Sequence, residues 1–246
     1  MLDTVMCGRL GSVEIAAVGL GNQIFFMLNM VVFGVSSGCS IFVSQFWGQQ
    51  DLKGIRKTFG IMLIFCIFVA FLFALGGIFL PEKLIGLYTN DGAVIKTAAG
   101  YLRIVAWSYP LMAFSLACQM AYRSTEHVVL PMATTAISFV LNASGNMLFI
   151  FGFEPLGIPK MGVAGAALAT LISRTVEFFI TLFYGRAKHF EPWGTLREMT
   201  AFSRPFILKL IKVGLPVLFS ETLWGLGITT QNSIFAHTGT DSFPAF

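Results

Sequence analysis

The stretch IAAVGLGNQIFFMLNMVVFGVSSGCSIFVSQFWGQQ, residues 15–50, contains 36 consecutive residues without a charged side chain. Four further stretches are also uncharged: 58–81, 104–122, 128–153 and 222–240. A helix needs about 20 apolar residues to cross the hydrocarbon core of a bilayer. Because a soluble domain could not bury five stretches of this length, the sequence predicts a protein embedded in a membrane.

The composition agrees with this prediction and excludes several function classes. Hydrophobic residues make up 56% of the chain and charged residues 11%, and the mean hydropathy is +0.78. The net charge of +4 is small and forms no concentrated basic face, which argues against nucleic-acid binding. The four cysteines lack CxxC spacing or a histidine partner and are expected to pack in the core, with no metal site. No DxxxD, HExxH or GxGD motif of a membrane enzyme occurs, so we expect no enzymatic activity.

The apolar runs are about twice as long as the strands of an outer-membrane barrel and do not alternate, so they predict helices. We expect an all-α, polytopic membrane helix bundle with about six full transmembrane helices and a partial first one. The glycines Gly34 and Gly38 are expected to bend the first full span, which is longer than the core is thick. The predicted spans are 1–11 (partial), 15–46, 57–80, 97–121, 131–153, 162–186 and 208–235.

Basic residues are distributed unequally between the two sides of the predicted bundle. Ten fall in the connections on one side: Lys53, Arg56, Lys57, Arg123, Arg186, Lys188, Arg197, Arg204, Lys209 and Lys212. Four fall on the other side: Arg9, Lys83, Lys96 and Lys160. The positive-inside rule makes the richer side cytoplasmic. We therefore expect a multi-pass protein of the inner or plasma membrane whose longest basic loop is cytoplasmic.

Pro192, Gly194 and Pro205 interrupt that longest loop. The predicted domains are a bundle over 1–186, a cytoplasmic inter-bundle linker over 187–207, and the first helix of a truncated second bundle over 208–246. The helix at 208–235 is expected to pack loosely or not at all against the first bundle, because its partners would belong to the second.

Polar side chains inside the spans are costly in lipid and usually face a cavity or a neighbouring helix. Here they recur at helical spacing on four spans: Asn22, Asn29, Ser36, Ser40 and Ser44; Ser108, Met112, Ser115, Gln119 and Tyr122; Thr135, Ser138, Asn142 and Asn146; Glu221, Trp224, Ile228 and Asn232. Such faces predict a cleft, with Asn22, Asn29, Gln119 and Trp224 lining it. The alternative is that these residues join helix to helix.

Two acids stand out among the charges inside the spans. Asp3 and Glu221 lie in apolar surroundings, so they are candidates for binding and releasing protons. Asp3 is on the incomplete first helix, and Glu221 is well inside a span with no basic residue nearby in the sequence. Arg174 and Glu177 are three residues apart on one predicted helix and are expected to neutralise each other.

Several motifs, in this order, resemble those of the multidrug and toxic compound extrusion (MATE) transporters. They are Asp3-Thr-Val-Met-Cys-Gly-Arg-Leu-Gly11 with the segment 15–23, Ser44-Gln-Phe-Trp-Gly-Gln-Gln-Asp51, Met120-Ala-Tyr-Arg123 with Pro131, Asn142-Ala-Ser-Gly-Asn146 before Gly152, Gly162-Val-Ala-Gly-Ala-Ala-Leu-Ala-Thr170, and Gly214-Leu-Pro216 with Glu221. The resemblance covers essentially the whole chain.

The resemblance implies twelve helices in two six-helix bundles around a central cleft, with efflux driven by proton or sodium entry. Asp3 matches the coupling acid of the first helix, and Asn142 matches the asparagine that partners it on the fifth. Asn146 occupies the position where some members carry a second aspartate. Glu221 resembles a cation-binding acid of the seventh helix.

The leading functional hypothesis is a cation-coupled antiporter that exports drugs or toxic organic cations, of which this chain is a fragment. Its expected partners are membrane lipid, a small organic substrate and a second bundle normally in the same chain, with H⁺ or Na⁺ as coupling ion and no cofactor. Two alternatives stay open: a flippase for lipid-linked oligosaccharides with a related fold, and an inactive truncated polypeptide. The sequence leaves the substrate, the ion and the oligomeric state open.

Overall fold

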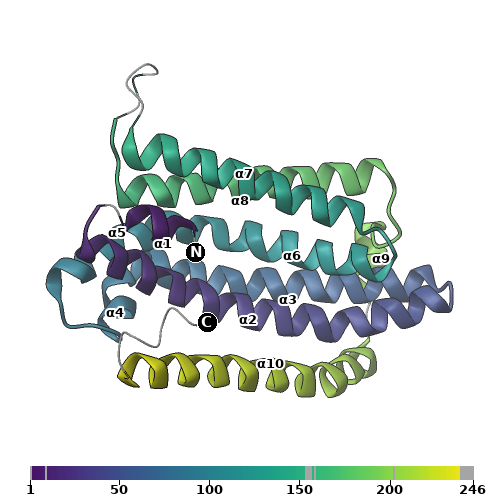
Figure 1. The fold of residues 1–246 in the computed structure, drawn as a ribbon. Helices are drawn as coiled ribbons and strands as arrows, with labels where there is room; N and C mark the ends of the chain where they lie inside the picture. Colours follow the sequence, from purple (N-terminus) through teal and green to yellow (C-terminus); the bar gives the residue numbers. More distant parts are fainter. Residues whose placement is uncertain (1, 9, 153–156, 158, 202, 239–246) are drawn as a thin grey trace.

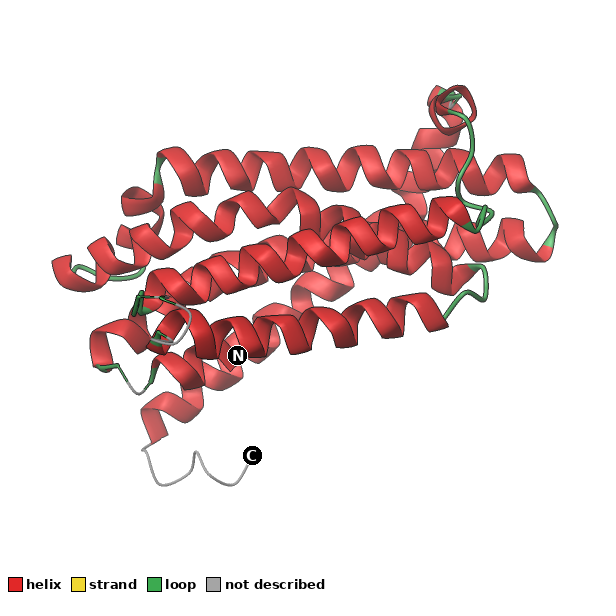
Figure 2. Cartoon of the chain, turned by 90° about the horizontal axis from the view of Figure 1, so that it is seen from above, coloured by secondary structure: helices red, strands yellow, loops and turns green. Residues whose placement is uncertain are grey.

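The computed structural model describes residues 2–8, 10–152, 157, 159–201 and 203–238, with the side chains of 2, 5, 226 and 228–238 excepted. All regular secondary structure in this part of the chain is helical (Figure 2), which confirms the predicted all-α class. The elements are α1 (Leu2–Cys7), α2 (Ser12–Gly48), α3 (Leu52–Phe79), α4 (Pro81–Gly86), α5 (Gly92–Val105), η1 (Ala106–Ser108), α6 (Tyr109–Ser124), α7 (Val129–Phe151), α8 (Val163–Ala187), α9 (Leu196–Thr200) and α10 (Arg204–Thr238).

Five helices in the described residues are long and apolar enough to cross a membrane. They are Ser12–Gly48, Leu52–Phe79, Gly92–Ser124, Val129–Phe151 and Val163–Ala187, and they match five of the six predicted full spans. The sixth, 208–235, lies within the long helix α10, which is not among the five. The last part of the predicted second-bundle segment, 239–246, lies outside the described residues.

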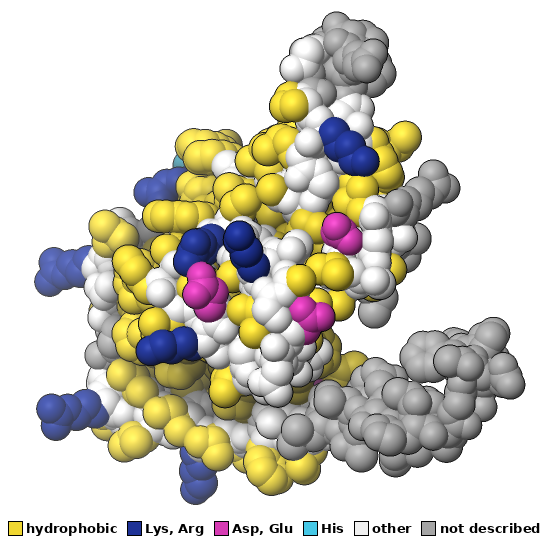
Figure 3. Space-filling model, turned by 90° about the vertical axis from the view of Figure 1, so that its left-hand side faces the viewer, with side chains coloured by type: hydrophobic (Ala, Val, Ile, Leu, Met, Phe, Trp, Pro, Cys, Tyr) yellow, Lys and Arg dark blue, Asp and Glu magenta, His cyan; other side chains and the backbone are white. Residues whose placement is uncertain are grey.

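The long helices lie roughly parallel and antiparallel to one another in layers (Figure 1). Helices α7 and α8 form one edge, α5 and α6 lie in the middle, α2 and α3 follow, and α10 forms the opposite edge. The largest buried side chains include Phe59, Tyr101, Tyr109 and Tyr122, so aromatic rings fill the centre of the bundle. Figure 3 views the end opposite the linker, where acidic and basic side chains appear among hydrophobic ones.

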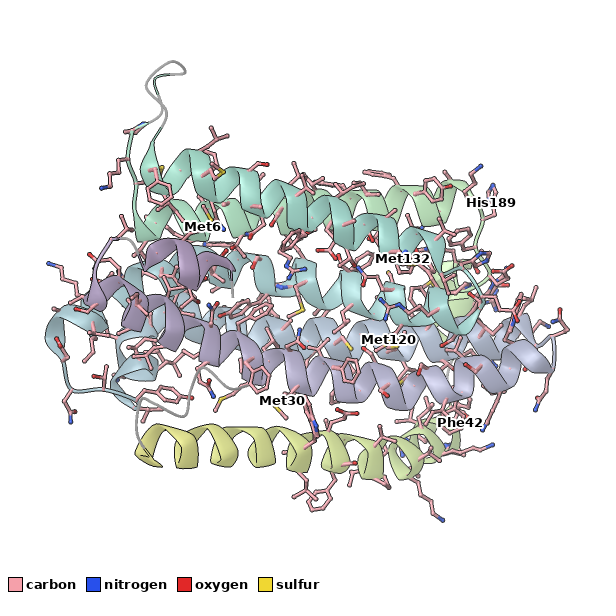
Figure 4. The ribbon with its side chains drawn as sticks, viewed as in Figure 1. Met6, Met30, Phe42, Met120, Met132 and His189 are labelled. Carbon is pink, nitrogen blue, oxygen red and sulfur yellow. The ribbon has the colours of Figure 1, made fainter. Side chains whose placement is uncertain are left out.

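The three connections rich in basic residues meet at the same end of the bundle. Arg56 at the start of α3 donates from Nη1 to Glu198 in α9 at 3.2 Å and from Nε to the Glu191 carbonyl at 3.4 Å. His127, between α6 and α7, lies 2.6 Å from the Glu191 carboxylate. The predicted grouping of these connections on one side is therefore confirmed, and Figure 4 places His189 at this end.

The first part of the predicted linker packs tightly on that end of the bundle. The indole N–H of Trp193 donates to the Tyr122 hydroxyl at 2.8 Å, and its ring meets Phe59 edge-on at 5.4 Å. Thr195 and Glu198 form a capping box at the start of α9. The backbone N–H of Thr195, bonded to Glu198, holds the pKa of that carboxylate below its usual range, and Arg56 contributes.

Helix α10 packs along α2, so the prediction that it packs loosely or not at all is wrong. Their contacts run antiparallel, from the Phe46 and Phe206 rings with centroids 6.2 Å apart to the closest backbone approach at Gly38 and Gly214. A Cβ atom added to Gly38 would lie 2.7 Å from the Gly214 Cα. Small residues let helix backbones approach this closely in membranes. Figure 4 labels Met30 and Phe42 on α2, beside α10.

Gly34 takes part in the same contact. Helix α2 is one uninterrupted helix of 37 residues, and both Gly34 and Gly38 are buried in it. A Cβ atom at Gly34 would lie 2.6 Å from Leu218. The two glycines therefore form the contact with α10, and the predicted bend at these positions stays a prediction.

An ion pair within α8, with Glu177 buried and Arg174 half-buried, lies at the contact between α8 and α6. Glu177 on α8 is 4% exposed, and it accepts hydrogen bonds from Arg174 Nη1 at 2.7 Å and from Gln119 Nε2 at 2.8 Å. The expected neutralisation of Arg174 by Glu177 is confirmed. Gln119, which was expected to line the cleft, is buried in the contact between α6 and α8.

We expect the Gly38→Leu variant to weaken the contact between α2 and α10. A leucine there would collide with the backbone at Gly214, and overpacking typically costs about 1–3 kcal/mol. Thermal unfolding of the purified protein in detergent should show a lower midpoint. Gly19→Leu on the same helix is the matched control, since a Cβ at Gly19 meets nothing within 4 Å. Equal midpoints for the two variants would contradict the proposed contact.

We expect the Glu177→Gln variant to be strongly destabilised, because Arg174 would lose its charge partner inside the bundle. Removing one member of a buried pair costs about 3–5 kcal/mol, whereas replacing both by apolar residues is often neutral. Denaturant unfolding in detergent should therefore rank Glu177→Gln below the double variant Arg174→Met/Glu177→Leu. The opposite ranking would mean that the pair is not coupled.

Candidate functional site

The acid Asp3 lies in the first turn of α1 and is buried against α7 and α8, with 8% of its surface exposed. Its Oδ1 accepts a hydrogen bond from Asn146 Nδ2 at 2.6 Å. Its Oδ2 accepts one from the Thr170 hydroxyl at 3.1 Å. The short helix α1 is thus tied to two membrane-spanning helices through one carboxylate.

Asn142 completes the cluster, which we call the Asp3 network: Asp3, Asn142, Asn146 and Thr170. Asn146 Nδ2 also donates to Asn142 Oδ1 at 3.2 Å, and Asn142 Nδ2 donates to the Thr170 hydroxyl at 3.1 Å. Asn142 and Asn146 are four residues apart on α7, so they share one face of the helix. The predicted pairing of Asp3 with Asn142 therefore runs through Asn146 and Thr170.

The network lies in the half of the bundle away from the linker. Asn146 is close to the end of α7 at Phe151, and Thr170 is two turns into α8, which begins at Val163. That end of both helices is opposite the end that carries α9 (Figure 1).

The charge of Asp3 has no basic partner within the described residues, where the ion pairs are Arg56–Glu198, Arg103–Glu82, His127–Glu191 and Arg174–Glu177. The Asn146 Oδ1 atom is buried and accepts no hydrogen bond from a described residue. An uncompensated carboxylate beside a free amide oxygen inside a membrane can take up a cation or a proton. The described residues contain no group of three or more His, Cys, Asp or Glu that could hold a metal ion.

Asn22 forms a neighbouring set of hydrogen bonds at Thr4, the residue after Asp3 on α1. Its Nδ2 donates to the Thr4 hydroxyl at 3.3 Å, and its Oδ1 accepts from the Tyr101 hydroxyl at 3.3 Å. Tyr101 also lines a pocket of about 520 Å³ with Glu14 and Lys160 at the end opposite the linker. This pocket adjoins the hydrogen bonds of Asn22, which no hydrogen bond among the described residues joins to the Asp3 network.

The other predicted cleft residues lie apart from the Asp3 network. Asn29 is half-buried and lies on the same face of α2 as Asn22. Its side chain makes no hydrogen bond to a described residue. Trp224 on α10 is 62% exposed. Glu221 on the same helix is half-buried and has no hydrogen bond or ion pair with a described residue. The structure therefore brings Asp3, Asn142 and Asn146 together and leaves Glu221 separate from them.

The sequence prediction missed two members of the site, Thr170 and Tyr101. Thr170 begins a polar stripe on α8 with Arg174, Glu177 and Thr181, at spacings of four, three and four residues. That stripe was a usable signal, since residues at this spacing share one helix face. Tyr101 gave no such signal, because its hydroxyl meets Asn22 only through the packing of α5 on α2.

Two curated relatives are similar to this chain in sequence. The probable multidrug resistance protein YoeA of Bacillus subtilis is 27% identical over all of this chain and 53% of its own length. The human multidrug and toxin extrusion protein 1 is 29% identical over 78% of this chain and 33% of its own length. The chain thus spans about a third to a half of the curated relatives it matches.

Solved structures share the fold. A MATE crystal structure in the bent conformation superimposes with a TM-score of 0.83 at 22% identity, covering 97% of this chain and 52% of that one. A MOP superfamily transporter from Pyrococcus furiosus, described as having a binding pocket of reverse polarity that suggests a different function, gives 0.81 at 23% identity over 95% and 50%.

The family model MatE matches residues 1–148, which include α1 and most of α7 and therefore Asp3, Asn142 and Asn146. The order of the motifs, the arrangement of the membrane helices and the relatives agree with this match. The chain belongs to the MatE family of multidrug and toxic compound extrusion transporters.

Proposed function

We propose that this chain supplies the first helix bundle of a cation-coupled antiporter that exports drugs or toxic organic cations. The observation that carries the proposal is the buried Asp3 carboxylate, bound by Asn146 and Thr170 and without a basic partner among the described residues. The names of the relatives, which refer to multidrug resistance and toxin extrusion, support the class of substrate.

Coupling would depend on the charge state of Asp3. In the anionic form both carboxylate oxygens accept hydrogen bonds, and these bonds hold α1 against α7 and α8. A proton on one oxygen would replace an acceptor by a donor. The free Asn146 Oδ1 is the acceptor that such a donor could use if the amide turned over. Protonation would thus exchange partners within the Asp3 network and shift α1.

A sodium ion would use the same atoms differently. The oxygens of Asp3, Thr170 and Asn146 are hard donors of the kind that alkali and alkaline-earth cations prefer. The ion would neutralise the carboxylate and, after the same turn of the amide, bind Asn146 Oδ1. Either cation changes the preferred position of α1 only to the extent that it binds one position more tightly than the other.

Glu221 is proposed as a second coupling acid. It is half-buried on α10, without a hydrogen bond or ion pair to a described residue, and its partners would come from the second bundle. One carboxylate can hold either the coupling ion or an organic cation, so binding of the ion would release the substrate.

We expect Asp3→Asn to abolish ion-driven efflux, because the amide has nearly the same shape but cannot be charged. The variant would be made in a protein that carries both bundles, reconstituted in liposomes, with dye efflux driven by a pH or sodium gradient. The rate should fall more than about tenfold, a typical loss when a proton-transferring group is removed. Glu82→Gln is the control, because Glu82 is exposed and pairs only with Arg103 in the described structure. Gradient-driven efflux at the original rate in Asp3→Asn would contradict the role of Asp3.

Binding can also be measured on this chain alone, since the Asp3 network lies within one bundle. Proton uptake and ²²Na⁺ binding by the purified protein in nanodiscs should both be compared with Asp3→Asn. The cation whose binding disappears in the variant is the coupling ion.

We expect Glu221→Gln to uncouple substrate release from the ion gradient in the same liposome assay. Its effect should appear only in the protein with both bundles, and cation binding to the present chain should not change. Efflux that keeps both its rate and its dependence on the gradient would reduce Glu221 to a structural residue.

A further inference from the structure

A second pocket of about 440 Å³ lies at the basic end of the bundle, where the turn between α2 and α3 meets the start of α10. Phe46 and Phe206 form two of its walls, with ring centroids 6.2 Å apart. Lys53 and Lys57 on α3 and Ser203 just before α10 also line it. The Asp3 network and the exported substrate do not involve this pocket, which is at the opposite end of α2.

The charges around the pocket favour an anion. Its lining contains two lysines and one acid, Asp51, whose Oδ1 accepts a hydrogen bond from the Gly54 N–H at 3.0 Å and so caps α3. Lys209, at the next turn of α10, lies with its Nζ 5.9 Å from the Phe42 ring. The ion pairs described at this end involve Arg56 and His127, so both pocket lysines remain available to a ligand.

Exposed apolar side chains lie near the pocket. Leu52, between the pocket residues Asp51 and Lys53 in the sequence, is 40% exposed, and Leu208, two residues after Phe206 on α10, is 65% exposed. An anionic group between two lysines, next to exposed leucines and two phenylalanine rings, fits a molecule with a charged head and apolar tails. Basic pockets between membrane helices on the cytoplasmic side bind such head groups.

We propose that this pocket binds the phosphate of an anionic phospholipid, with Lys53, Lys57 and the Ser203 hydroxyl around the head group and the acyl chains along Phe46, Phe206 and Leu208. The lipid would join the turn between α2 and α3 to the start of α10. Trp193 and Met199 already fix residues 193–199 to the bundle. The start of α10, which follows them in the chain, is therefore the first place where α10 could move relative to the bundle. The bound lipid would therefore hold α10 against α2 at the basic end.

The proposal depends on membrane embedding and not on ion coupling, so it can fail while the proposed function stands. The purified chain in neutral detergent would be titrated with phosphatidylglycerol and, separately, with phosphatidylcholine, and binding followed by native mass spectrometry. We expect Lys53→Gln/Lys57→Gln to bind phosphatidylglycerol about 30-fold more weakly, at the usual contribution of a basic residue near an anionic lipid. Lys53→Arg/Lys57→Arg should retain the affinity.

Matched variants separate a defined pocket from diffuse attraction. Lys83→Gln/Lys96→Gln removes two lysines at the opposite end and should leave phosphatidylglycerol binding unchanged. Ser203→Trp fills the pocket without changing its charge and should weaken binding even if the double lysine variant folds poorly. Unchanged affinity in Ser203→Trp, or an equal loss in Lys83→Gln/Lys96→Gln, would overturn the proposal.

The source of the phosphate is tested by competition. Inorganic phosphate and glycerol phosphate at millimolar concentration should not displace phosphatidylglycerol, because they lack acyl chains to bury against Phe46 and Phe206. Displacement by either at that concentration would show a site for free phosphate and would overturn the assignment to a lipid. Equal affinity for phosphatidylcholine would overturn it as well.

Discussion

A carboxylate without polar partners is costly inside a bilayer, and the hydrogen bonds of Asp3 offset that cost. The side chain is directed between α7 and α8, where Asn146 and Thr170 donate hydrogen bonds to it. These bonds help to fix α1, a helix of six residues that also packs through Met6 and the buried Cys7 on the hydrophobic core. The same interaction that holds α1 in the bundle is therefore the one that a coupling cation would have to change.

Two charged clusters inside the bundle have opposite characters. Glu177 is satisfied by Arg174 and Gln119, so it is a fixed anion in a neutral group. Asp3 has only neutral donors among the described residues, so its negative charge remains available. The difference lies in the partners and not in burial, since both acids are largely shielded from solvent. It explains why one acid is suited to structure and the other to binding a cation.

The packing of α10 on α2 differs from the division into two bundles that the sequence predicted. The helix that the sequence assigns to a second bundle lies against the first through Gly34, Gly38 and Gly214. Because glycine has no side chain, the hydrophobic pattern of a sequence does not show where glycine allows close packing of helices. The pairing of α2 with α10 depends on which glycines face each other across the two helices. The linker is likewise ordered where prolines and a glycine suggested a break, because Trp193 and Met199 find partners on α3 and α6.

Long uncharged runs determined by themselves that the chain forms membrane helices, because lipid offers no partner for backbone N–H and C=O groups. The resemblance of the motifs to a known family also implied that Asp3, Asn142 and Asn146 belong to one site, although Asn146 stands where some members carry an aspartate. Tertiary structure alone decided that Thr170 and Tyr101 join that site, that Gln119 binds Glu177, and that α10 lies on α2. The three hydrogen bonds connect residues 58 to 167 positions apart, and helical periodicity specifies the face of each helix but not the helix opposite it.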